Sequence, residues 1–92
     1  MNVPEDIASV LSQLCRESSA AFKRGDRETG VAAITSAATV ADNKLPESDL
    51  RQQVLHGCER AETVATADES ELGVAAEYAA SIERHLDETH TE

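Results

Sequence analysis

Apolar residues recur at every third or fourth position along most of the chain, and no segment alternates with a period of two. This spacing places apolar side chains on one face of an α-helix. Short breaks divide the pattern into four segments, which favours antiparallel neighbours. The sequence therefore predicts an all-α fold of four antiparallel helices, as a small bundle or as two stacked helical hairpins. The helices are expected at about residues 4–24, 27–43, 47–67 and 70–87.

The breaks between the predicted helices have local causes. Pro4 suits the first turn of a helix, because a backbone N–H would have no partner there. Gly25 can take the left-handed conformation that ends a helix, and Asp26 is well placed to cap the next one. Pro46 ends the second helix, since the residue before a proline avoids helical geometry. The acidic and polar segment 68–71 is expected to start the fourth helix.

The chain of 92 residues fits one small domain. We expect this domain to span residues 1–87 and residues 88–92 to form a frayed tail. Gly30, Gly57 and Gly73 lie inside predicted helices, each at a cost of about 1 kcal/mol relative to alanine. Close approach of another helix would explain Gly57, which lies on an apolar stripe. Gly73 lies well off its stripe and fits this explanation poorly.

Acidic residues outnumber basic ones by 18 to 8, which gives a formal net charge of −10. This charge repels phosphate groups and argues against a nucleic-acid partner. No apolar run is long enough for a membrane span, and the acidic N-terminus does not look like a secretory signal, so we expect a cytoplasmic protein. Large apolar residues are few, so further burial against a protein partner or a second copy is expected.

The sequence resembles two kinds of known protein. Small and apolar residues surround a Gly-Asp turn at Ser18, Ala21, Gly25, Asp26, Gly30, Val31, Ile34 and Ala37. In this pattern residues 15–42 resemble a degenerate tetratricopeptide-type helical hairpin, although Asp42 stands where that family usually has proline and no second repeat follows. The scarcity of lysine and the many carboxylates and alanines make the whole chain similar to the small acidic helical proteins of halophilic archaea. That similarity implies a fold and a high-salt habitat, and it carries no activity with it.

Residues that could bind a metal are few and poorly spaced. His56 and Cys58 lie about 200° apart around a helix, so they cannot share one ion. A hydrolase of the nucleotide pyrophosphohydrolase type would need paired carboxylates on two successive helices. Glu59 and Glu62 supply one pair, but Glu77 lacks the second carboxylate three positions later. A small all-α hydrolase dependent on Mg²⁺ or Mn²⁺ is therefore kept as the alternative, and we assign no catalytic residue, metal site or cofactor.

The two cysteines, Cys15 and Cys58, are expected to be free thiols in a cytoplasmic protein. Cys58 falls on the inner stripe of its helix, as is common for this residue type. A thiol-based sensor that uses both cysteines is a third hypothesis.

Apolar residues away from the inner stripes are the candidate interface. Val40, Leu55 and Val74 each fall more than about 110° from the centre of their helix's stripe, and Tyr78 lies on a flank. Exposed apolar residues that gather into a patch mark an interaction site. The sequence therefore favours a non-catalytic protein-interaction or assembly module, which self-associates or docks a partner protein.

Overall fold

Four helices account for nearly all of the chain that the structure describes. The computed structural model describes residues 5–67 and 71–90, with side chains through Asp87. These residues form α1 (Glu5–Lys23), α2 (Arg27–Lys44), α3 (Asp49–Thr66) and α4 (Leu72–His90), and they contain no strand. The predicted all-α fold of four helices is confirmed. Within these residues, no helix combines the length and the apolar character that a membrane span requires.

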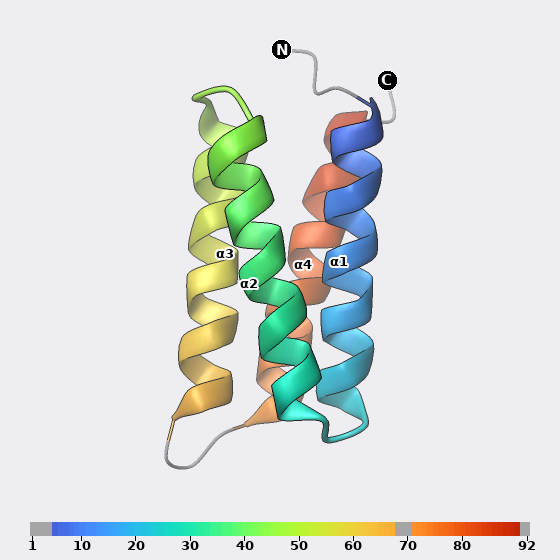
Figure 1. The fold of residues 1–92 in the computed structure, drawn as a ribbon, viewed down its shortest axis with the longest axis vertical. Helices are drawn as coiled ribbons and strands as arrows, with labels where there is room; N and C mark the ends of the chain where they lie inside the picture. The colour runs from blue at the N-terminus through green and yellow to red at the C-terminus, as the bar shows by residue number, and fades with distance from the viewer. Residues whose placement is uncertain (1–4, 68–70, 91–92) are drawn as a thin grey trace.

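Successive helices run in opposite directions and lie side by side (Figure 1). α1 packs against α2 and α4, and α3 packs against the same two helices. The order around the bundle is therefore α1, α2, α3, α4. The α1–α2 hairpin forms one layer and the α3–α4 hairpin the other, so the outer surfaces of the two hairpins face in opposite directions.

The turn between α1 and α2 has the predicted chemistry. Gly25 adopts a φ of 84°, a left-handed conformation that favours glycine. Asp26 caps α2, because its carboxylate accepts a hydrogen bond of 3.1 Å from the backbone N–H of Thr29. The expected ends of this turn at residues 24 and 27 agree with the observed ends to within one residue.

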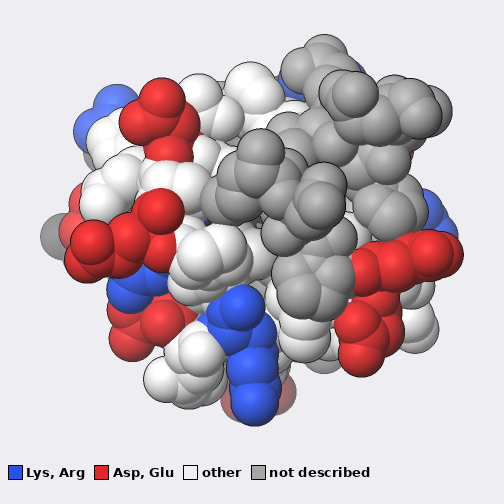
Figure 2. Space-filling model, turned by 90° about the horizontal axis from the view of Figure 1, so that it is seen from above, with Lys and Arg blue, Asp and Glu red and all other residues white. Residues whose placement is uncertain are grey.

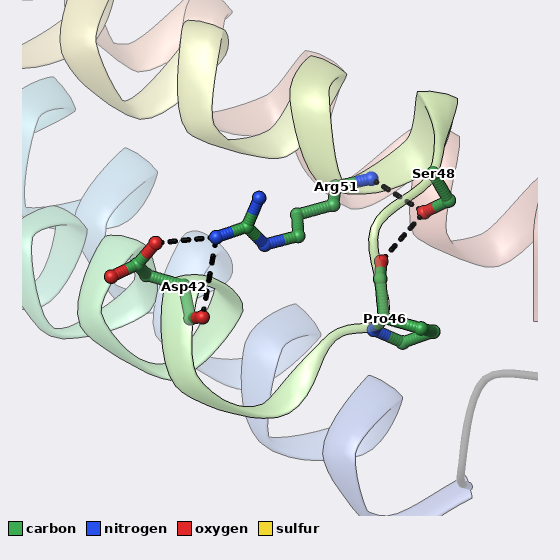
Figure 3. A network of polar contacts seen from close by, with 4 residues as sticks. All are labelled: Asp42, Pro46, Ser48 and Arg51. Carbon is green, nitrogen blue, oxygen red and sulfur yellow. Dashed lines mark hydrogen bonds and ion pairs between the residues drawn. The ribbon is translucent and has the colours of Figure 1, made fainter.

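The turn between α2 and α3 is held by a small polar network (Figure 3). The Ser48 hydroxyl accepts a hydrogen bond of 3.2 Å from the Arg51 backbone N–H and donates one of 3.0 Å to the Pro46 carbonyl. The Arg51 guanidinium reaches back to α2, where it lies 2.6 Å from a carboxylate oxygen of Asp42. Because Ser48 serves as the cap, α3 begins at Asp49, two residues later than expected.

The fourth helix differs most from its expected bounds. It begins at Leu72, two residues later than expected, and continues through His90, three residues beyond the expected end. Neither glycine nor proline follows Leu86 to stop it. The expected start of the first helix at Pro4, the expected restart at residues 68–70 and the last two residues of the expected tail lie outside the described residues.

Small residues make up much of the core. One cluster runs along the bundle and includes Leu11, Ile34, Val54 and Leu86. A second cluster lies near the turn between α1 and α2 and consists of Phe22, Ala65, Ala75 and Ala76. Both clusters contain many alanines, so the helices can approach one another closely.

Two buried serines on α1 are fully hydrogen-bonded. The Ser18 hydroxyl donates a hydrogen bond of 2.8 Å to the carbonyl of Gly30 on α2. The Ser19 hydroxyl donates one of 3.1 Å to the carbonyl of Ala76 on α4. These bonds satisfy two hydroxyls that would otherwise be costly to bury.

Two of the helical glycines are explained by close packing. A Cβ atom added to Gly57 would lie 2.7 Å from Cγ1 of Ile82 on α4, and one added to Gly30 would overlap the ring of Phe22. A Cβ atom added to Gly73 would meet no atom within 4 Å. The expectation of a close helix approach at Gly57, and of none at Gly73, is confirmed.

The cap at Asp26 makes a testable contribution to acid stability. Hydrogen bonds from Thr29, with the nearby Arg24, lower the pKa of Asp26 below its usual value. The stabilisation is therefore complete above the unfolded-state pKa of about 3.9 and is lost as the pH falls through the lower folded-state pKa. Asp26→Asn keeps the cap but removes the titration.

We expect the wild type to lose more stability than Asp26→Asn when the pH is lowered below about 4. Urea unfolding followed by circular dichroism at several pH values measures the difference. The other carboxylates are common to both proteins and cancel in the comparison. Parallel stability curves for the two proteins would contradict the assigned role of Asp26.

Candidate interaction surfaces

A shallow, open depression lies along the outer seam between α3 and α4. It consists of two adjoining hollows of about 280 and 240 Å³, which share Tyr78 and Ser81. We call the pair the α3–α4 hollow. Its lining residues are Gln53, His56 and Gly57 from α3 and Val74, Glu77, Tyr78, Ser81, Ile82, Arg84 and His85 from α4.

The floor of the α3–α4 hollow exists because small residues meet there. Gly57 has no side chain, and its backbone approaches Ile82 closely. Ser81 is the small residue common to both hollows. Tyr78 forms a wall and packs against the main core cluster, while the guanidinium of Arg60 lies 5.9 Å from the centre of its ring. This cation–π contact helps to hold the tyrosine ring in place.

The α3–α4 hollow is lined by apolar and polar side chains together. Val74 is 40 % exposed, which makes it one of two large apolar residues with high exposure among the described residues. The 240 Å³ part contains no carboxylate in its lining, although the chain has 18 acidic residues. The arrangement suits an apolar side chain with hydrogen-bonding groups around it.

The structure places the four predicted interface residues on different seams. Val74 and Tyr78 line the α3–α4 hollow together. Val40 lies about 200° around α2 from Asp42, which faces α3, and it is therefore on the side toward α1. Leu55 lies one turn from Arg51, on the side of α3 that faces α2. Val40 and Leu55 are half-buried against the main core cluster, so the four residues do not form one patch.

Val10, at 45 % the most exposed large apolar residue within the described part of the chain, was not among the predicted interface residues. Ile7, Leu11 and Leu14 are spaced at three or four residues, which predicts that their side of α1 faces the core, and Val10 lies near the edge of that side. In the structure Cys15 and Ser19 are buried, while Ile7 and Leu14 are only half-buried. Because Cys15 and Ser19 are buried, α1 is rotated about its axis relative to the predicted orientation, and Val10 lies at the surface.

Val10 and Val40 lie at nearly the same level of the α1–α2 hairpin. Ser18 is hydrogen-bonded to Gly30, which fixes the register of the two helices. Val10 lies eight residues before Ser18, and Val40 lies ten residues after Gly30. At about 1.5 Å per residue, these distances along the two antiparallel helices differ by only about 3 Å.

We call the outer surface of this hairpin the α1–α2 face. Its members are the apolar or small residues Val10, Leu14, Ala32, Ser36 and Val40, all exposed or half-buried. Ala32, Ser36 and Val40 follow one another at intervals of four residues and so share one side of α2.

The hairpin behind the α1–α2 face carries long segments without charge. Residues 7–15 of α1 and 29–41 of α2 contain no Asp, Glu, Lys or Arg. Because the helices are antiparallel, these segments lie next to each other over most of the length of 7–15. Elsewhere acidic residues are frequent; seen from above, they gather on the left and right of the bundle, with basic side chains beside them (Figure 2).

The two thiols do not form a reactive site. Cys15 and Cys58 are both free and buried. Burial raises the pKa of Cys58 to about 12, and it raises that of Cys15 further still. A raised pKa disfavours the thiolate, which is the form that reacts. The burial of both thiols therefore argues against the thiol-sensor hypothesis, which stays untested.

The structure brings no further support to a hydrolase. His56 is exposed whereas Cys58 is buried, as their helical spacing predicted. Glu59, Glu62 and Glu77 are all exposed. In the part of the chain that the structure describes, no group of three or more His, Cys, Asp or Glu residues is arranged to hold a metal ion.

Comparison with known proteins places the chain in a family. No curated protein and no solved structure matches the chain. A family model described as a domain of unknown function, DUF8101, matches residues 1–88, which is nearly the whole chain. The four-helix bundle described above is therefore a member of the DUF8101 family.

Proposed function

We propose that this chain is a non-catalytic protein-interaction module that docks a partner protein at the α3–α4 hollow. The observation that carries the proposal is the exposure of Val74 beside Tyr78, whose ring also lines the adjoining hollow where Gly57 and Ile82 form the floor. An aliphatic or aromatic side chain of the partner would fill this space and bury the apolar surface.

The open shape of the hollow favours a protein side chain over a small molecule. Its two parts measure about 280 and 240 Å³ and are open to solvent. Sites for small molecules are usually more enclosed. Gln53, His56 and Ser81 can exchange hydrogen bonds with a partner at the edge, as is usual at protein interfaces.

We further propose that the module works at high salt, for which the cytoplasm of a halophilic archaeon is the natural setting. A net charge of −10 on a chain of 92 residues opposes the compact state through self-repulsion. Molar salt reduces the screening length to about 3 Å and removes most of this penalty.

Val74→Glu tests the proposed docking site. Val74 is exposed, so the substitution is expected to leave the fold intact, while it places a charge in the lining of the 280 Å³ part of the hollow. Thr63→Glu is the matched control, because Thr63 is exposed on α3, does not line the hollow and gives the same change in charge. The three proteins serve in parallel as baits for extracts of the source organism in molar KCl, and each captured protein is then purified and titrated by calorimetry.

We expect a partner that binds the wild type and Thr63→Glu with similar affinity and binds Val74→Glu at least about tenfold more weakly, or about 1.4 kcal/mol. Equal affinity of the partner for all three proteins would place its binding elsewhere on the chain. Failure of the wild type to retain any protein would contradict the proposed function.

A further inference from the structure

We infer that the partner segment that docks at the α3–α4 hollow is acidic and places a carboxylate beside the apolar side chain that fills the hollow. This inference rests on the proposed function and deepens it, because it names the chemistry of the partner at the same site. The charged and polar residues of α3 and α4 around the hollow carry it.

Two arginines without an ion pair border the α3–α4 hollow. Arg84 lines its 280 Å³ part, and the guanidinium of Arg60 lies 5.9 Å from the centre of the Tyr78 ring. Both arginines are exposed, and neither forms an ion pair with another residue that the structure describes. Three other arginines do pair with carboxylates of the chain, namely Arg16, Arg24 and Arg51. A guanidinium has five N–H donors, so Arg60 and Arg84 can each bind a carboxylate of a partner.

The 240 Å³ part of the hollow adds hydrogen-bond donors. His56 from α3 and His85 from α4 line it, together with Gln53, Tyr78 and Ser81. Each of these side chains has a group that can donate a hydrogen bond, and none is a carboxylate. An ionised carboxylate has only acceptors, so this part of the lining complements it.

The carboxylates of α3 at this level lie on other sides of the helix. Gly57 marks the side that faces α4, because its backbone approaches Ile82 closely. Between residues 50 and 67 the acidic residues are Glu59 and Glu62, which lie about 160° and 140° around α3 from Gly57. Arg60 lies only about 60° from Gly57. Along this stretch α3 therefore places a cation, and no carboxylate, beside the hollow.

The acidic residues of α4 between positions 72 and 87 are divided between two sides of the helix. Glu83 lies 2.8 Å from Arg16 of α1, and Asp87 follows it by four residues on the same side. Glu77 lines the 280 Å³ part of the hollow, seven residues or about 10 Å along the helix from Arg84. A carboxylate of the partner is therefore attracted by Arg84 and opposed by Glu77, and both effects can be measured.

An acidic protein segment fits this site better than a basic segment or a nucleic acid. A basic segment would meet the charges of Arg60 and Arg84. A nucleic acid carries a phosphate at every nucleotide, so the net charge of −10 opposes it along its length. A segment with one or two carboxylates meets less repulsion, and at molar salt the screening length of about 3 Å confines that repulsion to groups nearly in contact.

Selection from a random library of displayed twelve-residue peptides tests the inference. The library is selected on the immobilised wild type in 1 M KCl and then depleted on Val74→Gln, which leaves the peptides that need the apolar contact without favouring either sign of charge. We expect the remaining peptides to carry Asp or Glu next to an apolar residue more often than the starting library does.

Substitutions of opposite sign then test the charges of the hollow itself, with the selected peptides as ligands in calorimetry. The double variant Arg60→Gln, Arg84→Gln is expected to raise the Kd about two- to fivefold, and Glu77→Gln is expected to lower it by about twofold, as is usual for exposed charges. Lys44→Gln and Glu62→Gln are the matched controls, because both residues are exposed and outside the lining, and they should leave the Kd unchanged. Circular dichroism melts establish that each variant is folded.

The possible results separate this inference from the proposed function. Peptides that depend on Val74 but are neutral or basic, or whose Kd is the same for all the charge variants, would overturn the inference and leave the proposed function standing. Displacement of the peptides by a short single-stranded oligonucleotide, but not by polyglutamate, would assign the arginines to phosphates and would also overturn it. A selection that yields no peptide dependent on Val74 would contradict the proposed function, and the inference with it.

Discussion

Phe22→Ala is expected to lower the free energy of unfolding by about 3–5 kcal/mol, the usual range for a large-to-small change at a buried phenylalanine. Phe22 is the only phenylalanine of the chain and is 1 % exposed. Its buried neighbours in the second core cluster are Ala65, Ala75 and Ala76, whose side chains are too short to fill the space, and the larger Val31, Val64 and Leu72 pack against the cluster from its partly exposed side. The cavity therefore persists, and its cost adds to the lost transfer energy.

Urea unfolding in molar KCl measures this loss. A chain of 92 residues has a total stability of about 5–14 kcal/mol, so Phe22→Ala removes a large part of it. Phe22→Leu is the control, because it keeps most of the apolar volume and should cost clearly less. A loss below about 1 kcal/mol in Phe22→Ala would show that the surrounding helices collapse into the space.

Gly30→Ala and Gly57→Ala are each expected to destabilise the bundle by about 1–3 kcal/mol, because a methyl group is forced into a filled space. At Gly30 the obstacle is the buried ring of Phe22, and at Gly57 it is Ile82, which is 2 % exposed. The loss exceeds the gain in helix propensity that alanine brings.

Gly73→Ala is the control for both substitutions, since an added Cβ meets no atom there. It is expected to stabilise the chain by up to about 1 kcal/mol through helix propensity alone. Thermal and urea unfolding of the three variants give the comparison. Stabilisation by all three substitutions would mean that the helices are not held at the observed separation.

The helices themselves could be predicted from the sequence because their signals are local. Gly25 and Asp26 specify the first turn, and Ser48 follows the proline that ends α2. Each signal acts within a few residues, so it does not depend on the rest of the fold. Only the start of α3 and both ends of α4 were misplaced, by two or three residues.

The face that each helix buries was predicted less accurately than the ends of the helix. In α1 the buried side includes Cys15 and Ser19, whereas the pattern suggested Leu14. When a core is built from alanine, serine and cysteine, several faces of a helix have similar polarity. Contacts with the neighbouring helices then decide which face is buried, and these contacts are not visible in the spacing of residues.

For the same reason, the candidate surfaces could be predicted only in part. Val74 and Tyr78 were expected outside the inner stripe, and the structure adds that they share a hollow with Gly57 from another helix. Val10 became exposed only through the rotation of α1. Sequence periodicity places residues around one helix, but a surface between two helices requires their register.

The paired bonds of Ser18 and Ser19 have a consequence for the uniqueness of the native state. Seams lined by alanine are nearly uniform along their length, so one helix could slide past another by a turn at little cost in packing. The two serines are adjacent in sequence, yet they bind carbonyls on two different helices. A slip of either neighbour would separate a buried hydroxyl from the carbonyl that accepts its hydrogen bond. These two bonds therefore favour one register of α1 against α2 and α4 over other registers that would bury a similar apolar area.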